Sequence, residues 1–147
     1  MTAQGFDPEL FLQMGRDVLA QQPFSLLLGA ELTHLKPGEV ELQLVLKDEL
    51  RQQHGFAHGG VVSYLADNAL TYAGGTAMRV PVVTSEYKIN YLKPATGERL
   101  VARAKAIGIG KTQAVCRCEV YAVRGHEETL CALAQGTITK MGEAPPG

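Results

Sequence analysis

The stretch HGFAHGGVVSYLADNALTYAGG, residues 54–75, decides the fold. Small and apolar side chains dominate it, and with the residues that follow they predict a buried helix from Val61 to Met78. The stretch contains one carboxylate, Asp67, and no lysine or arginine. Because removing a carboxylate from water is costly unless it is paired, we expect Asp67 to have either a partner or a chemical task.

The residues before this stretch predict another helix. Asp7, Pro8 and Glu9 form a typical helix start, with an acidic cap, a proline at the first position and a second acid in the first turn. Pro23 ends this helix. Apolar residues recur along it at helical spacing and predict a face that packs on the rest of the protein: Leu10, Phe11, Met14 and Val18.

The remaining segments alternate with a period of two or are rich in β-branched and aromatic residues, which is typical of strands. We expect strands at 25–35, 40–46, 82–93, 99–107, 112–123 and 128–140. The turns KPGE, PATGE, GIGK and RGHE are short, so they predict antiparallel hairpins and a final four-strand meander. A helix that is apolar all round must be covered all round, so the sheet should curl around it and approach it closely at Gly74 and Gly75.

Length and composition fit one domain and argue against several classes of protein. The chain has 147 residues, of which 46% are hydrophobic and 20% charged, and a formal net charge of −1. This balance predicts neither a nucleic-acid-binding nor a membrane-binding surface. The start of the chain lacks the basic and apolar runs of a signal peptide, and Cys116, Cys118 and Cys131 match no disulfide or metal spacing. We therefore expect a cytoplasmic protein with reduced core cysteines, the first two on one face of a strand.

The sequence resembles the phenylacetate-degradation (PaaI-like) branch of the hotdog acyl-CoA thioesterases over residues 24–141. The motif GFAHGGVVSYLADN carries the resemblance, because a histidine and two glycines open the helix and an acid follows nine residues after the histidine; EYKINYLKPA supports it. The resemblance implies an α+β hotdog fold, with an antiparallel β-sheet wrapped around a long central helix. The chain would be a single hotdog domain, 1–147, with an extra N-terminal helix (1–23), a core (24–141) and a flexible tail (142–147).

The resemblance also implies an active site at the start of the helix. The first turn of a helix has unpaired N–H groups at the positive end of the dipole, and Gly59 and Gly60 leave these groups uncovered. The Gly59 N–H would be the main oxyanion donor and Gly60 would help to bind the substrate, with His58 shaping the turn. Asp67 would be the general base that activates water, or a nucleophile that forms a mixed anhydride.

The resemblance implies roles for further residues, which stand at positions where the family has functional side chains. Gln52 stands where the family often has an asparagine whose amide also holds the thioester carbonyl. Thr84 or Ser85 stands where a family hydroxyl orients the attacking water, and the strand register favours Thr84. Lys111 lies in a hairpin turn, where it either meets a coenzyme A phosphate or is simply solvated. The residues expected to bind substrate are Gly60, Ser85, Asn68 and Lys111.

A distance argument constrains the assembly. Gly59 and Asp67 are eight residues apart, so along one helix they are separated by about 12 Å. Both cannot touch the same thioester carbon. We therefore expect the donor of one chain to meet the acid of a second chain, in a homodimer with two shared sites, and the resemblance implies a tetramer built as a dimer of dimers.

Asp67 and the nearby histidines also have other possible roles. Asp67 could be a structural acid that caps a loop or pairs with a buried cation. A metal held by His54, His58 and Asp67 is disfavoured, since no third histidine or cysteine is near. We therefore expect no metal and no cofactor apart from the coenzyme A thioester substrate.

The preferred function is hydrolysis of an acyl or aryl-acyl thioester to free acid and coenzyme A. A hotdog hydratase or dehydratase is disfavoured because RQQHGFAHGG has no proline before the helix. A non-catalytic acyl-CoA-binding protein would have no need for Asp67.

Overall fold

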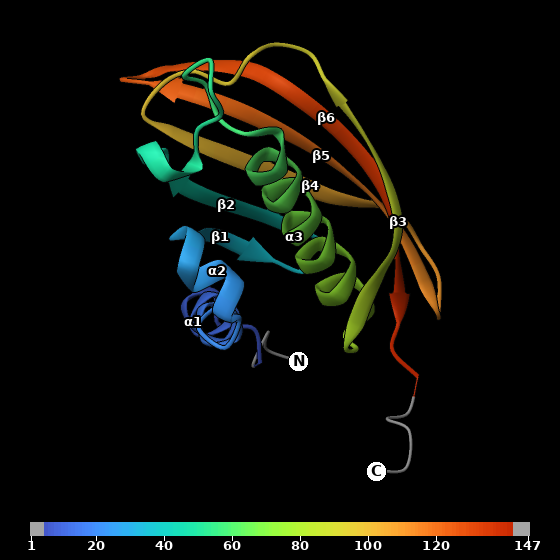
Figure 1. Ribbon diagram of the computed structural model, residues 1–147. Coiled ribbons are helices and arrows are strands. Elements are labelled where there is room, and N and C mark those ends of the chain that lie inside the picture. The colour runs from blue at the N-terminus through green and yellow to red at the C-terminus, as the bar shows by residue number, and fades with distance from the viewer. Residues whose placement is uncertain (1–4, 143–147) are drawn as a thin grey trace.

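The protein is built around one long helix held by a curved antiparallel sheet (Figure 1). The structure, a computed structural model, describes residues 5–142. The helix is α3 (Gly59–Met78), and the strands lie in the order β1-β2-β4-β5-β6-β3. Their bounds are Glu31–Lys36 for β1, Glu39–Val45 for β2, Val82–Tyr91 for β3, Arg99–Ile109 for β4, Gln113–Arg124 for β5 and Glu127–Lys140 for β6. This arrangement confirms the predicted sheet around a central helix.

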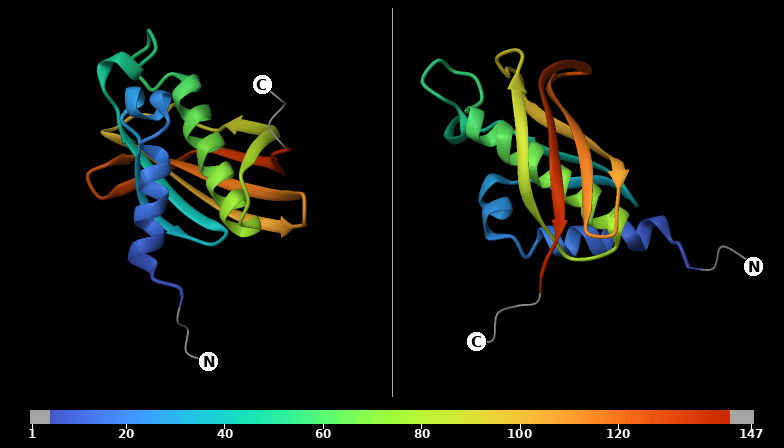
Figure 2. Two further views of the ribbon diagram at one scale, coloured as in Figure 1. Left: turned by 90° about the horizontal axis from the view of Figure 1, so that it is seen from below. Right: turned by 90° about the vertical axis from the view of Figure 1, so that its right-hand side faces the viewer.

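Three shorter elements complete the described chain. Helices α1 (Pro8–Leu19) and α2 (Pro23–Leu28) lie beside β1, and a 3-10 helix (Asp48–Leu50) precedes α3 (Figures 1 and 2). The predicted start of α1 is confirmed, because the Asp7 carboxylate accepts the backbone N–H groups of Glu9 and Leu10. The tail predicted for 142–147 lies outside the described residues, apart from Gly142.

The sheet buries one face of α3, and nine of the 20 helix residues are buried. Five helix residues have no exposed surface: Leu65, Ala66, Ala69, Leu70 and Ala73. The strand residues that face them are also fully buried, among them Leu42, Leu100, Val120 and Ile138. Cys116 and Cys118 are buried on β5 and Cys131 on β6, all three as free thiols, which confirms the predicted core cysteines. The core therefore lies between α3 and the concave face of the sheet.

The first predicted strand, 25–35, is partly wrong. Residues 23–28 form α2, and β1 begins only at Glu31. Pro23 stands at the first helical position, where it is favourable, and Gly29 ends the helix in the left-handed conformation with φ 77°. Pro23 thus begins a helix and does not end the first one, because α1 already ends at Leu19 with Ala20 as its C-cap.

The predicted four-strand meander is also wrong. β3 pairs with β6 at the far edge of the sheet, and β4 pairs with β2 and β5. The connection PATGE is therefore no hairpin, because it carries the chain across the ends of β6 and β5. Backbone hydrogen bonds hold this crossing, from Leu92 N–H to the Cys131 carbonyl (2.8 Å) and from Glu98 N–H to the Val123 carbonyl (2.8 Å). The KPGE hairpin between β1 and β2 is confirmed.

Of the face predicted for helix α1 only Phe11 packs against the core. Leu10, Met14 and Val18 are all more than half exposed, whereas Gly15 and Leu19 are buried. The contact depends on a glycine, because a β-carbon at Gly15 would lie 2.5 Å from a Leu35 methyl carbon and 2.6 Å from a Leu32 methyl carbon. At the same point the Tyr72 hydroxyl of α3 donates to the Gly15 carbonyl at 2.8 Å. Met14 and Val18 instead border an apolar groove of about 510 Å³ between α1 and α3.

Gly74 lies where the sheet approaches α3 most closely, as expected from the sequence. A β-carbon at Gly74 would lie 2.7 Å from the Ile138 β-carbon, whereas one at Gly75 would meet the Val82 methyl at 3.1 Å. Alanine at either position gains helix propensity. We expect Gly74→Ala to destabilise the protein by roughly 1–3 kcal/mol through overpacking. Gly75→Ala is the matched control, and equal melting temperatures for the two variants would contradict the close-approach argument.

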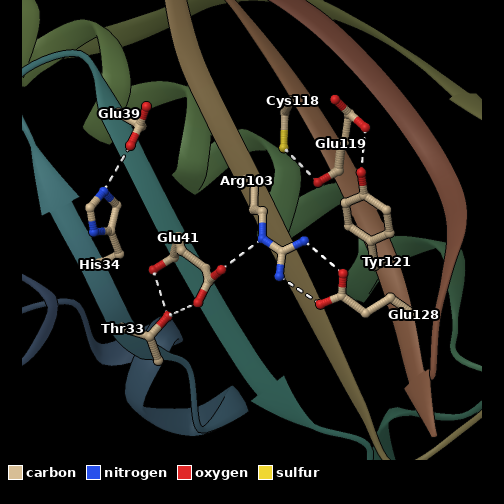
Figure 3. Close-up of polar contacts among 9 residues, drawn as sticks. All are labelled: Thr33, His34, Glu39, Glu41, Arg103, Cys118, Glu119, Tyr121 and Glu128. Carbon is tan, nitrogen blue, oxygen red and sulfur yellow. Dashed lines mark hydrogen bonds and ion pairs between the residues drawn. The ribbon is translucent and has the colours of Figure 1, made fainter. Parts of the chain in front are cut away.

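A charged cluster covers the sheet face that points away from α3 (Figure 3). Arg103 lies at its centre, donating to both Glu128 oxygens at 2.8 and 2.6 Å and to Glu41 at 2.7 Å. The hydrogen bonds from Arg103 lower the pKa of Glu128. Burial alone would raise the pKa of Glu41, but hydrogen bonds from Arg103 and Thr33 outweigh it and lower the pKa.

This cluster predicts acid-sensitive stability. Each carboxylate has a lower pKa in the folded chain than the ordinary value of 4.5, so its stabilisation is complete above that pH and is lost as the pH falls through the lower folded values. Because the pairs are partly exposed, we expect a total of roughly 1 kcal/mol. Thermal unfolding followed from neutral pH to about pH 3 measures it. Arg103→Gln should lose less stability on acidification than the parent, and equal losses would refute this assignment.

Candidate active site

The start of α3 presents an unpaired backbone donor. His58 is the N-cap residue, with φ −61° and ψ 135°, and its Nδ1 accepts the Gly60 N–H at 2.8 Å. The Val61 N–H donates to the His58 carbonyl at 3.0 Å. The Gly59 N–H has no acceptor within residues 5–142, so it stays free at the positive end of the helix dipole.

Gly60 allows His58 to cap the helix. A β-carbon at Gly60 would lie 2.9 Å from the His58 Nδ1, which is too close for the observed contact. A β-carbon at Gly59 would meet the Tyr91 ring at 3.5 Å, an ordinary van der Waals distance. Because Nδ1 accepts a hydrogen bond, neutral His58 carries its proton on Nε2. The structure therefore places His58 as the residue that shapes the turn.

A cavity of about 310 Å³ opens beside Gly59. Its walls include Gln52, Phe56, Val62, Tyr91 and Pro94. The Gln52 Oε1 accepts the His54 N–H, so the other end of this amide, Nε2, is a donor with no acceptor in the part of the chain that the structure describes. Gly59 and Gln52 thus bring two free donors to the wall of one cavity.

Asp67 lies on the face of α3 that points to β3. It is half-buried, and the Thr84 Oγ1 donates to its Oδ1 at 2.6 Å, in agreement with the strand register that favoured Thr84. Its Oδ2 accepts no hydrogen bond from the described residues, nor does any lysine, arginine or histidine among them form an ion pair with Asp67. One carboxylate oxygen is therefore oriented and the other is available.

A β-bulge in β3 aims two hydroxyls at α3. The pairing with β6 shifts between Thr84 and Glu86, so Ser85 is the extra residue and is exposed. As a result Tyr87 faces inward as well as Thr84, and its hydroxyl lies 2.6 Å from the Ser63 Oγ. Without the bulge, Glu86 would share the inward face with Thr84.

The predicted site residues fall into two groups on α3. Gln52, His58, Gly59 and Gly60 gather at its N-terminus, whereas Asp67 and Thr84 meet about 12 Å further along the axis. Gly59 and Asp67 both belong to α3, so the described chain does not bring the donor and the acid together.

Two predicted substrate-binding residues lie apart from both groups. Asn68 points to α2, where its Nδ2 donates to the Gln22 Oε1 at 3.0 Å and to the Tyr64 hydroxyl oxygen at 3.2 Å. Lys111 is exposed in the β4–β5 turn, next to Thr112, which bonds the end of β6. Their substrate-binding roles, and that of exposed Ser85, stay predictions.

Three residues near these groups were not predicted: Ser63, Tyr87 and Tyr91. Ser63 lies four residues before Asp67, so helical spacing alone could have placed it on the same face. Tyr87 could not be found, because the bulge changes which residues of β3 face inward. Tyr91 lies in the segment EYKINYLKPA, but its contact with the helix start depends on a tertiary approach.

The described residues point away from thiol chemistry. Cys131 borders the cavity at Gly59, but burial raises the pKa of its thiol to about 11, and its Sγ donates to the Val120 carbonyl at 3.3 Å.

Among residues 5–142 no three histidine, cysteine or acidic side chains gather closely enough to hold a metal ion. No helix in that range is long and apolar enough to cross a membrane.

Comparison with known proteins identifies the family. The sequence model of the thioesterase superfamily matches residues 54–129, a range that includes His58, Gly59, Asp67 and Thr84. A human protein named acyl-coenzyme A thioesterase 13 is 32% identical over 111 residues, covering 74% of this chain and 76% of the human one.

Solved structures agree with this match. A thioesterase family protein from Silicibacter pomeroyi superposes with a TM-score of 0.84 at 40% identity, covering 90% of this chain and 99% of that one. A mutant form of the phenylacetic acid degradation protein PaaI from Thermus thermophilus gives a TM-score of 0.73 at 33% identity, covering 82% of this chain and 100% of that one. The chain therefore belongs to the thioesterase superfamily and is a thioester hydrolase with the hotdog fold.

Proposed function

We propose that this protein hydrolyses acyl- or aryl-acyl-coenzyme A to the free acid and coenzyme A, with Asp67 as general base or nucleophile and the Gly59 N–H as oxyanion donor. One observation carries the proposal: α3 has a free N–H at its start and an oriented carboxylate with a free oxygen two turns later. The human relative's name, acyl-coenzyme A thioesterase 13, supports the choice of coenzyme A thioesters.

The donor group stabilises the negative charge that develops on the thioester oxygen. The Gly59 N–H and the Gln52 Nε2 border one cavity, and neither has another acceptor to satisfy within the described chain. Donors that are already aligned cost no reorganisation when the tetrahedral intermediate forms. Gln52 can therefore take the place of the asparagine that is frequent in the family.

Asp67 supplies the nucleophile in one of two ways. As a base, it takes a proton from water while the water oxygen bonds to the carbonyl carbon; the C–S bond then breaks and the departing sulfur receives a proton. As a nucleophile, it displaces the thiolate to form a mixed anhydride that water hydrolyses. In both cases the Thr84 hydroxyl, bonded to Oδ1, orients the carboxylate so that Oδ2 faces the reaction.

The complete site requires two copies of the chain. About 12 Å of helix separates the two groups, so the acid of one copy must meet the donor of another. β3 is an edge strand whose outer side pairs with no strand of the described chain. Pairing of two β3 edges would place two α3 helices side by side and antiparallel, with one shared site at each end. This dimer is a proposal, as is its assembly to a tetramer.

Asp67→Asn should remove turnover and leave the fold intact. The asparagine Oδ1 still accepts from Thr84, and no described cation loses a partner, so the melting temperature should stay near that of the parent. Turnover of acyl-CoA substrates, followed with a thiol-reactive dye, should fall by about 10² or more. Full activity in this variant would exclude Asp67 as base or nucleophile, and a large drop in melting temperature would identify a structural acid instead.

Mixed dimers test whether the site is shared. Gly59→Pro removes the donor N–H at a first-turn position that tolerates proline, after a residue whose ψ of 135° suits it. Gly59→Ala keeps the N–H and is the matched control. Mixing equal amounts of inactive Asp67→Asn and Gly59→Pro should restore about a quarter of parental activity, because half the dimers are mixed and one of their two sites is intact. If activity does not recover after subunit exchange has been demonstrated, the shared-site proposal is wrong.

A further inference from the structure

We propose that Tyr91 is a positioning residue for the oxyanion donor, holding the Gly59–Gly60 peptide together with His58 so that the Gly59 N–H points at the substrate. The inference rests on the proposed function of the Gly59 N–H. Its starting point is a contact across the fold: the Tyr91 hydroxyl, at the end of β3, donates to the Gly59 carbonyl at 3.0 Å.

The same peptide unit is held on its other side. Its carbonyl accepts from Tyr91, and its N–H, which belongs to Gly60, donates to the His58 Nδ1 at 2.8 Å. The hydrogen bonds therefore form a chain from the Tyr91 hydroxyl through the peptide to the imidazole. Bonds in such a chain polarise and strengthen one another. The plane of this peptide is thus fixed from both ends, while the preceding N–H, that of Gly59, is left free.

Because Gly59 and Gly60 are consecutive glycines, the peptide between them needs hydrogen bonds that hold its orientation. Glycine has the widest range of backbone angles, and Gly59 has no side chain of its own to restrict the turn. Electrostatic stabilisation of an oxyanion depends on donors that are already aligned when charge develops. The Tyr91 ring also packs beside Gly59, because its atoms would lie at an ordinary van der Waals distance of 3.5 Å from a β-carbon there.

Tyr91 is itself fixed by the backbone around it. The next residue, Leu92, donates its N–H to the Cys131 carbonyl at 2.8 Å. Further along the same segment, the Ala95 carbonyl accepts the Ala57 N–H at 3.0 Å. The segment that follows β3 is therefore bonded directly to the segment that precedes α3. These backbone hydrogen bonds fix the position of the Tyr91 hydroxyl relative to the start of the helix. The ring also borders the cavity beside Gly59, so a simple role as pocket wall must be separated from the positioning role.

Tyr91→Phe separates these roles, because it keeps the ring and removes only the hydroxyl. We expect kcat on a hydrolysed acyl-CoA to fall about fivefold to tenfold, as for loss of one hydrogen bond that acts in the transition state, with KM nearly unchanged. Tyr121→Phe is the matched control, since Tyr121 lies on the outer face of the sheet and bonds Glu119 there. It should keep parental kcat and KM.

A second readout does not depend on turnover. In the ¹⁵N-labelled protein, Tyr91→Phe should shift the Gly59 and Gly60 amide resonances and speed their hydrogen exchange, at an unchanged melting temperature. Parental kcat in Tyr91→Phe, a change in KM alone, or unmoved Gly59 and Gly60 amides would each overturn the inference. If Asp67→Asn keeps full activity while these amides move, the proposed role of Asp67 fails and the positioning of Gly59 stands.

Discussion

The structure depends on the burial of one face of α3 against the sheet. Because residues such as Leu65, Ala69 and Ala73 have no exposed surface, the sheet must curve around the helix and approach it closely. The close approach requires small residues, and Gly74 on α3 meets the β-carbon of Ile138 on β6. Polar groups lie at the start of the helix, on its face toward β3 and on its face toward α2, where Asn68 bonds Gln22. The candidate site occupies the first two of these places.

A β-bulge in β3 keeps a second carboxylate away from the face of α3 that carries Asp67. A regular strand would alternate Thr84 and Glu86 on the inner side, which would put a second carboxylate beside Asp67. The bulge at Ser85 turns Glu86 outward, where it accepts from Thr137, and turns Tyr87 inward to Ser63. Asp67 therefore has hydroxyl neighbours, and no like charge competes with it on this strand.

The sequence was sufficient for features that depend on local periodicity. The buried helix, the cap at Asp7, the KPGE hairpin and the inward register of Thr84 were all predicted, because each follows from spacing along one or two elements. The pairing of β3 with β6 was missed, since short connections can also cross the end of a sheet. The inward turn of Tyr87 and the contact of Tyr91 with Gly59 depend on a bulge and on a tertiary approach, which no spacing rule encodes.

The straight course of α3 underlies both the alignment of the proposed donor and the proposal of a dimer. A straight helix fixes the Gly59 N–H at the end of its dipole, and the contacts of His58 and Tyr91 hold the first peptide in place. The same straightness holds Asp67 about 12 Å away, so no movement within the helix can close the gap. In the proposed dimer, a second copy with its helix reversed would bring an acid to each donor without any change of fold. Dimer symmetry would then supply what one helix cannot, because each chain would contribute its donor to one site and its acid to the other.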